Sequence, residues 1–114
     1  MLHIPQIKKS LGIDQIYTEY YSWRSKTSTP AAQIDLLIER ADNLINLCEI
    51  KYSQFPYAIT KEEEMRIRTR MADFVDETGV RHGVLPTLIT TFGVRKTAHS
   101  SIAQVQLTMD ELFG

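Results

Sequence analysis

The sequence predicts an α/β fold in which helices flank a mixed central sheet. Three observations predict it: several runs rich in β-branched and aromatic residues, two of these runs close enough to form a hairpin, and a long amphipathic helix after the hairpin. The chain has 114 residues, of which 43% are hydrophobic and 24% are charged, which is typical of one globular domain. We expect a single domain over residues 1–114 with the element order α-β-β-β-α-β-β.

The first elements are expected to be a short helix, a strand and a loop. Apolar residues recur at helical spacing between 4 and 11, and Gly12 follows where a left-handed helix end favours glycine. Because this helix begins so close to Met1, we expect it to be the tail of a longer element. Residues 16–23 have the composition of a strand, and the polar segment 25–30 ends in proline, as many loops do.

Two apolar runs, 33–38 and 44–51, predict an antiparallel hairpin. Asp42 and Asn43 in the connection tolerate the positive φ that a tight turn needs. Both runs are apolar on both faces of the pleat, so we expect the hairpin to be central in the sheet and covered on both sides.

A helix is expected over 61–78. Thr60 and Glu63 form a capping-box pattern at its start, and Gly79 fits its end. One apolar stripe of this helix is predicted to face the core: Ile67, Met71, Phe74 and Val75.

Two strands are expected to complete the sheet. The first is 84–92, in which Pro86 limits pairing at the start, and the second is 102–108.

Charge and cysteine content exclude several classes of protein. Thirteen Lys and Arg against fourteen Asp and Glu give a net charge of −1, which excludes a strongly basic nucleic-acid coat but not a local basic patch. Cys48 is the sole cysteine, so the chain can form no internal disulfide and no cysteine-rich zinc site. No apolar run approaches the roughly 20 residues that span a bilayer, and we expect a cytoplasmic protein.

Charged residues inside the apolar runs mark the candidate site, because burying an unpaired charge costs several kcal/mol. Asp35 interrupts the first arm of the hairpin, and Glu49 and Lys51 interrupt the second at a spacing that points both side chains to one face. A turn over 41–43 would place Asp35 opposite Glu49, whereas a turn one residue shorter or longer would send the two carboxylates to opposite faces. Loop length therefore decides whether the carboxylates meet.

Two carboxylates about 5 Å apart repel each other and attract a divalent cation, and oxygen ligands of this kind suit Mg²⁺ or Mn²⁺. A neighbouring lysine completes what phosphodiester hydrolysis needs: a metal ion that polarises the phosphate and activates water, and a cation that stabilises developing charge. The alternative is a purely structural ion-pair cluster of Asp35, Glu49 and Lys51. Composition alone does not separate the two interpretations.

Asp35, a hairpin and Glu49-Ile50-Lys51 together resemble the D-(spacer)-E-x-K signature of the PD-(D/E)xK nuclease superfamily. The expected order of elements is similar to that family's core, so the resemblance covers most of the chain and implies a restriction-endonuclease-like fold. It also implies that Asp35 and Glu49 hold Mg²⁺ or Mn²⁺ with help from the Ile50 carbonyl, and that Lys51 is the catalytic lysine. The implied substrate is nucleic acid, with DNA expected.

More narrowly, residues 33–38 and 45–51 resemble the C-terminal nuclease-like domain of a family of prokaryotic P-loop (AAA-type) ATPases. This resemblance implies that the chain is a C-terminal fragment of a longer protein, and that its partner is a P-loop ATPase domain in the same protein. The sequence contains no G-x-x-x-x-G-K-[ST] motif, so no ATPase activity is expected from these 114 residues.

The sequence departs from the superfamily pattern at two places. Ile34 precedes Asp35 where the superfamily's name has proline, a change that we expect to be tolerated. Segment 1–11 contains no Asp or Glu, although many relatives carry an acid on the first helix. Three explanations stay open: the acid lies upstream of this chain, Glu19 replaces it, or the domain is a catalytically inactive module. Such a module would bind nucleic acid or a protein partner and regulate the ATPase.

Other polar and aromatic residues are expected to have structural roles. His3, His82 and His99 match no metal-ligand spacing and are expected on the surface or in loops. Cys48 is expected to be a small core residue, and Gln33 a hydrogen-bonding neighbour of the site. Four aromatic residues are expected to pack in the core or at an interface, with stacking on bases as the alternative: Tyr17, Tyr20, Tyr21 and Trp23. Six basic residues are expected to be solvated, with a phosphate-tracking face as the alternative: Arg66, Arg68, Arg70, Arg81, Arg95 and Lys96.

Overall fold

A computed structural model describes residues 4–27 and 32–109 of the chain. The order of elements is the predicted α-β-β-β-α-β-β, with one short 3₁₀ helix before the last strand. The elements are α1 (Ile4–Ser10), β1 (Thr18–Arg24), β2 (Gln33–Arg40), β3 (Leu44–Lys51), α2 (Lys61–Thr78), β4 (Gly83–Thr90), η1 (Ser100–Ile102) and β5 (Val105–Thr108).

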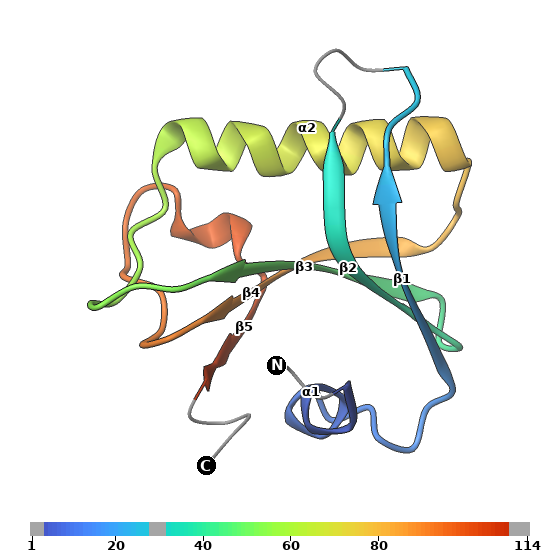
Figure 1. Cartoon of the computed structure of the whole chain (residues 1–114), viewed down its shortest axis with the longest axis horizontal. Helices are drawn as coiled ribbons and strands as arrows, with labels where there is room; N and C mark the ends of the chain where they lie inside the picture. Colours follow the sequence, from blue (N-terminus) through green and yellow to red (C-terminus); the bar gives the residue numbers. More distant parts are fainter. Residues whose placement is uncertain (1–3, 28–31, 110–114) are drawn as a thin grey trace.

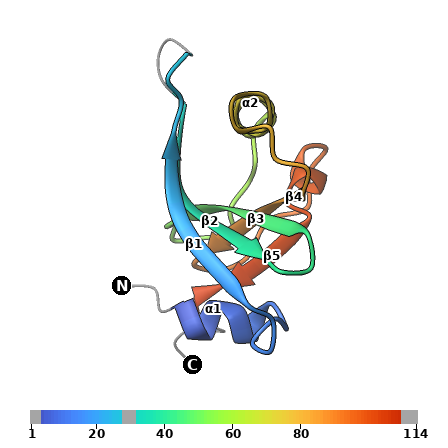
Figure 2. The same ribbon diagram turned by 90° about the vertical axis from the view of Figure 1, so that its right-hand side faces the viewer.

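The five strands form one mixed sheet in which spatial order follows chain order, β1-β2-β3-β4-β5. The pairs β1–β2 and β2–β3 are antiparallel, and the pairs β3–β4 and β4–β5 are parallel. The long helix α2 connects β3 to β4 and covers one face of the sheet, while α1 lies against the other face (Figures 1 and 2). The molecule thus has three layers, α1, sheet and α2.

The predicted central hairpin is confirmed, because each of its faces contributes to a separate core. On the side of α1, Ile38 and Cys48 pack with Ile7 of the helix. On the side of α2, Leu37 and Leu47 of the hairpin pack with Phe74, which also touches Trp23 of β1 edge-on at 5.5 Å between ring centroids. This double burial explains why β2 and β3 are apolar on both faces.

The helix α2 has the predicted bounds because its caps are encoded locally. The Thr60 side chain accepts a hydrogen bond from the Glu63 backbone N–H, and Gly79 adopts the left-handed conformation, with φ 68°. The predicted inward stripe is correct for Ile67 and Phe74, which are buried, but wrong for Val75, which is exposed. No helix in the described part of the chain is long and apolar enough to cross a membrane.

The predicted hairpin register is confirmed, since the pairs run from Glu39↔Ile45 to Leu36↔Cys48. The turn occupies residues 41–43, and Asn43 takes the positive φ, 67°, that its side chain tolerates. With this turn length, the side chains of Glu49 and Lys51 lie on the face of the sheet that α2 covers.

The strand β2 carries a bulge that the alternation of its residues does not reveal. Between the pairs Tyr21↔Leu37 and Trp23↔Ile34, β1 advances two residues and β2 advances three. Ile34 and Leu37 consequently both reach the core beneath α2, and the interval between them contains Asp35. Bulges commonly redirect a side chain beside a functional site.

The last two strands differ from prediction in detail. Pro86 lies within β4 and pairs with Leu47, while β5 begins to pair only at Thr87. The proline therefore occupies a stretch where β4 has one partner, which removes the conflict over its missing N–H. Ile102, predicted to begin the final strand, belongs to η1, and β5 starts at Val105.

A buried polar pair was not predicted from the sequence. Asn46 and Thr87 are fully buried on adjacent parallel strands, and the Asn46 side-chain amide donates to the Thr87 hydroxyl at 2.9 Å. The Asn46 oxygen accepts from Arg40 at 3.1 Å. All three polar groups thus find partners, which is the condition for burying them at acceptable cost.

Candidate functional site

A polar cavity of about 370 Å³ lies where β2, β3 and α2 meet. Its lining residues are Gln33, Asp35, Cys48, Glu49, Ile50, Lys51 and Arg70. The three residues proposed from the sequence, Asp35, Glu49 and Lys51, are therefore brought to one cavity. Their metal-binding and catalytic roles stay predictions.

Asp35 lies in the bulge of β2 and its side chain is exposed. The Gln33 side-chain amide, expected near Lys51, donates to Asp35 Oδ1 at 2.9 Å. The regular pairing of β2 with β3 ends at Leu36↔Cys48. Asp35 therefore reaches the cavity from the irregular end of β2, beyond the last regular pair with β3.

Glu49 is largely buried, with 13% of its side chain exposed, and Arg70 of α2 pairs with it through Nη1 and Oε1. A guanidinium donating to a carboxylate is among the stronger polar contacts in proteins. It stabilises the buried negative charge that the sheet would otherwise leave unpaired.

Lys51 is placed by two residues that lie outside the sheet. Its Nζ is 3.9 Å from Glu63 Oε2 of α2 and 5.9 Å from the centre of the Tyr57 ring. The Tyr57 hydroxyl donates to the same Glu63 oxygen. Burial, together with the Glu63 carboxylate that accepts this bond, raises the pKa of Tyr57 above its usual value. The phenol therefore remains a hydrogen-bond donor at neutral pH.

Sequence reasoning did not assign Glu63, Tyr57 and Arg70 to the site. A signal for the two helix residues is present, because Glu63, Ile67, Arg70 and Phe74 follow the i, i+4, i+7, i+11 spacing of one helix face. Two charges on the inward stripe of a helix indicate partners in the sheet. Of the helix arginines expected to be solvated, Arg66 and Arg68 are exposed, whereas Arg70 turns inward.

The residues of the cavity fit a divalent cation in part. Mg²⁺ is usually bound through one or two protein carboxylates plus water and substrate oxygens, and Asp35 and Glu49 supply two. Ile50 packs its side chain into the core on the side of α1, so what it presents to the cavity is its main chain. Across residues 4–27 and 32–109, no three His, Cys, Asp or Glu side chains cluster in a metal-binding arrangement.

The structure does not bring Glu19 to the cavity. Glu19 pairs with Glu39, toward the opposite end of β2 from Asp35, and its carboxylate accepts from Tyr17. The helix α1 lies on the other face of the sheet from the cavity. Neither segment supplies a third acid to the site.

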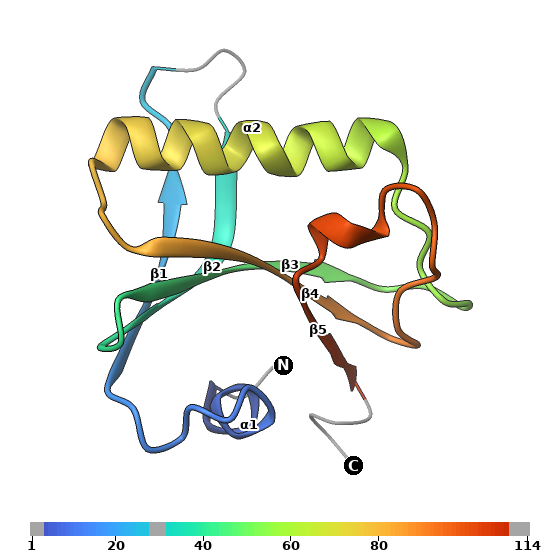
Figure 3. The ribbon, with the colours of Figure 1, turned by 180° about the vertical axis from the view of Figure 1, so that it is seen from behind.

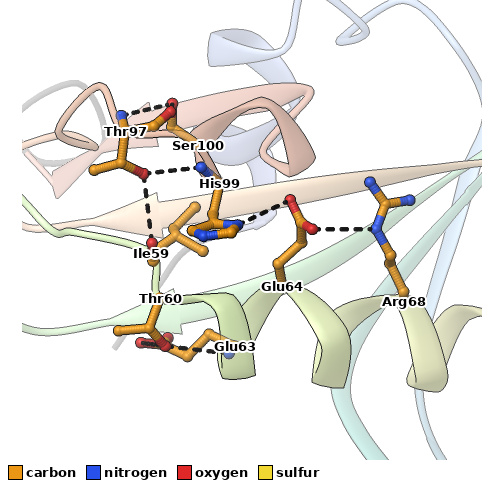
Figure 4. A network of polar contacts seen from close by, with 8 residues as sticks. All are labelled: Ile59, Thr60, Glu63, Glu64, Arg68, Thr97, His99 and Ser100. Carbon is orange, nitrogen blue, oxygen red and sulfur yellow. Dashed lines mark hydrogen bonds and ion pairs between the residues drawn. The ribbon is translucent and has the colours of Figure 1, made fainter.

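A second polar network holds the segment before β5 against the start of α2 (Figure 4). Thr97 donates to the Ile59 carbonyl at 3.4 Å, and His99 Nδ1 lies 3.7 Å from Glu64, which also pairs with Arg68. His82 and His99 lie in the predicted loop regions, whereas His3 lies outside the described residues.

The fold and the cavity together define an α/β protein with a polar site between its mixed sheet and its long helix. Among solved structures, the chain is similar to the crystal structure of a protein of unknown function, AF1548, with a TM-score of 0.57 and 17% identity over 89% of this chain. The chain spans about half, 53%, of that protein's length. A likeness at this identity shows a shared fold alone. No family model and no curated protein matches the sequence.

Proposed function

We propose that this domain is a divalent-metal-dependent phosphodiesterase, a nuclease-like domain acting on DNA. The observation that carries the proposal is that Asp35, Glu49 and Lys51 line one cavity, although they come from a bulge on β2 and the end of β3. The D-(spacer)-E-x-K resemblance adds support through the identity and order of the same three residues. A P-loop ATPase domain attached in a longer protein is part of this proposal.

In this proposal Asp35, Glu49 and the Ile50 carbonyl hold Mg²⁺ or Mn²⁺. The bound ion would polarise the scissile phosphate and favour deprotonation of water at neutral pH. Gln33 orients Asp35 by donating to Oδ1. Holding one oxygen of a ligating carboxylate in this way is how neighbouring residues commonly fix a ligand.

Lys51 supplies the positive charge that a phosphorane-like transition state needs. Glu63 and Tyr57 restrict where the ammonium group lies, so little reorganisation is needed when substrate enters. A Lys51→Arg change would keep the charge but not the position, because the guanidinium is larger and planar.

Arg70 has two roles in this mechanism. In the structure it neutralises Glu49. When a cation takes over that neutralisation, the guanidinium can turn to a phosphate oxygen, for which its paired N–H groups are well suited. The buried Glu49 charge would thus be compensated by Arg70 in the absence of a metal and by the cation when one is bound.

Loss of either carboxylate is expected to abolish metal-dependent cleavage without unfolding the domain. We expect Asp35→Ala and Glu49→Gln to show no cleavage of labelled single-stranded and duplex DNA in millimolar Mg²⁺ or Mn²⁺, measured by gel electrophoresis. Asp76→Asn is the matched control, because Asp76 is an exposed carboxylate on α2 away from the cavity, and it should cleave like the wild type. Cleavage retained in both site variants would end the proposal.

A catalytically inactive module that regulates an ATPase is the second candidate. The observation that favours it is the pairing of Glu49 with Arg70, which satisfies the buried carboxylate without a metal. Thermal unfolding with and without Mn²⁺ separates the candidates, because a ligand that binds only the folded state raises Tm once its concentration exceeds its Kd. A rise in the wild type that is absent in Asp35→Ala supports the phosphodiesterase. An unchanged Tm in both, together with no cleavage, supports the inactive module.

A further inference from the structure

Three strongly exposed aromatic side chains lie on the loops that follow β3 and β4. Tyr52 is 77% exposed, Phe55 71% and Phe92 53%. Tyr52 directly follows Lys51, which ends β3, and Phe92 comes shortly after Thr90, which ends β4. Because Lys51 and Thr90 are paired neighbours on parallel strands, both loops leave the sheet at the same edge, at the left of Figure 1 and the right of Figure 3.

Hydrogen bonds fasten these two loops to each other. The Ser53 backbone N–H donates to Thr91 Oγ1 at 3.2 Å. The Tyr57 N–H donates to the Gly93 carbonyl and the Arg95 N–H to the Tyr57 carbonyl, each at 2.8 Å. The aromatic side chains are therefore carried by one connected surface.

This surface is basic and carries no acidic residue of its own. Segments 52–60 and 91–109 contain no Asp or Glu, although the chain has fourteen. Arg95 and Lys96 are exposed on the second loop. Of the neighbouring carboxylates, Glu63 pairs with Lys51. Glu64 pairs with Arg68 (Figure 4). The surface is therefore suited to a polyanion.

We propose that Tyr52, Phe55 and Phe92 form a stacking platform for single-stranded nucleic acid, whose phosphates contact Arg95 and Lys96. Single exposed aromatic residues are ordinary, but aromatic rings combined with cations on an acid-free surface are what binds unpaired bases and their backbone. Duplex nucleic acid hides the faces of its bases, so the platform selects unpaired strands. We name this surface the aromatic platform.

The aromatic platform rests on the proposed function and specifies its substrate. Glu49 lies three residues before Tyr52 on β3, a separation of about 10 Å in an extended chain. The phosphodiester backbone of a nucleic-acid strand whose bases stack on the platform therefore reaches the cavity. The inferred substrate of the phosphodiesterase is accordingly a single strand or an unpaired end.

The test is binding of a labelled single-stranded oligonucleotide of about 12 nucleotides, followed by fluorescence anisotropy in EDTA so that no cleavage takes place. We expect Tyr52→Ala, Phe55→Ala and Phe92→Ala each to weaken binding by about 5- to 100-fold, and Tyr52→Phe to bind like the wild type. Arg95→Gln with Lys96→Gln should reduce the salt dependence of binding, because phosphate contacts release counterions. DNA and RNA oligonucleotides of the same sequence identify the preferred sugar.

Matched controls use the exposed tyrosines at the other end of the molecule. Tyr17→Ala and Tyr20→Ala remove equally exposed rings from β1 and its approach, and should change affinity by less than about twofold. Equal weakening by these controls, or unchanged binding by the three platform variants, would overturn the proposal. Competition by polyglutamate as effective as that by DNA, or loss of self-association in the platform variants, would overturn it in favour of a protein-binding surface.

The two proposals fail separately in this design. Asp76→Asn is expected to bind single strands like the wild type, since Asp76 is an exposed residue of α2 that lines neither the platform nor the cavity. If the wild type binds single strands but cleaves none, the phosphodiesterase proposal is overturned and the platform proposal stands. If the wild type cleaves single strands and duplexes at equal rates, or if the platform variants keep the wild-type preference for single strands, the platform proposal is overturned and the phosphodiesterase proposal stands.

Discussion

Cys48 and Glu49 are neighbours in sequence but lie in opposite environments. The Cys48 side chain packs in the core on the side of α1, while Glu49 reaches toward α2 and pairs with Arg70. Burial, with a smaller contribution from the adjacent Glu49 carboxylate, raises the pKa of the Cys48 thiol to about 12. Because the thiolate is the reactive form, Cys48 is not a nucleophile in the folded protein.

We expect the thiol of Cys48 to react with a disulfide reagent at pH 8 only when the protein unfolds. The measurement is the rate of absorbance increase with Ellman's reagent, with and without denaturant. Cys48 is the sole cysteine, so the signal has one source. A native-state rate close to that of a free thiol would contradict both its burial and its raised pKa.

Individual site residues were predictable where a strand's alternation and a turn length defined them. Asp35, Glu49, Lys51 and Gln33 line the cavity as expected. Arg70 was not predicted to be a site residue. The spacing of the helix arginines gives their positions around the helix axis but not the rotation of the helix against the sheet. That rotation depends on packing between segments distant in sequence.

At the scale of elements, α2 shows which features local sequence controls. Its bounds follow from Thr60 and Gly79, whose capping interactions are formed by nearby residues. Its inward face depends on packing against the sheet, because Phe74 and Val75 are adjacent apolar residues and the helix buries only Phe74 fully. The edge-on contact of Phe74 with Trp23 favours Phe74.

The adjacent pair provides a matched test of this packing. We expect Phe74→Ala to reduce the free energy of unfolding by about 3 to 5 kcal/mol, and Val75→Ala to change it by no more than about 0.5 kcal/mol. Denaturant unfolding followed by fluorescence of Trp23, the sole tryptophan, measures both. Phe74→Leu, a milder change, keeps the comparison possible if the alanine variant does not fold. Similar losses at the two positions would contradict the observed rotation of α2.

At the scale of the whole molecule, one carboxylate joins the β1–β2 connection to the far end of α2. Glu77 accepts hydrogen bonds from the Ser25 hydroxyl and, at 2.9 Å, from the Lys26 backbone N–H. The bond from Ser25, then that from Lys26, lowers the pKa of Glu77 below its usual value of 4.5. The contact ties together segments about 50 residues apart, so it is not visible as a local pattern.

The lowered pKa gives this contact a defined pH dependence. A group whose pKa is lower in the folded state contributes stability above its unfolded pKa and loses it as pH falls through the folded pKa. We therefore expect the difference in unfolding free energy between wild type and Glu77→Gln to be constant above about pH 5 and to shrink below pH 4.5.

Asp76→Asn is the control, because it removes an adjacent exposed carboxylate on the same helix. Denaturant unfolding at a series of pH values measures the two differences. If the difference in unfolding free energy between wild type and Glu77→Gln grows as pH falls, the lowered pKa of Glu77 is contradicted.

Because the strands lie side by side in the order in which the ribosome makes them, most of the sheet can assemble during synthesis. β2 meets β1, and β3 meets β2, as soon as each leaves the exit tunnel. The free edge of β3 must then wait for β4, the segment Gly83–Thr90. At about 5 to 20 residues per second, that wait lasts about 2 to 8 s. During this wait β3, the most apolar strand made so far, exposes unpaired backbone N–H and C=O groups to other nascent chains. Translation of α2 is therefore the step at which this protein is most exposed to aggregation.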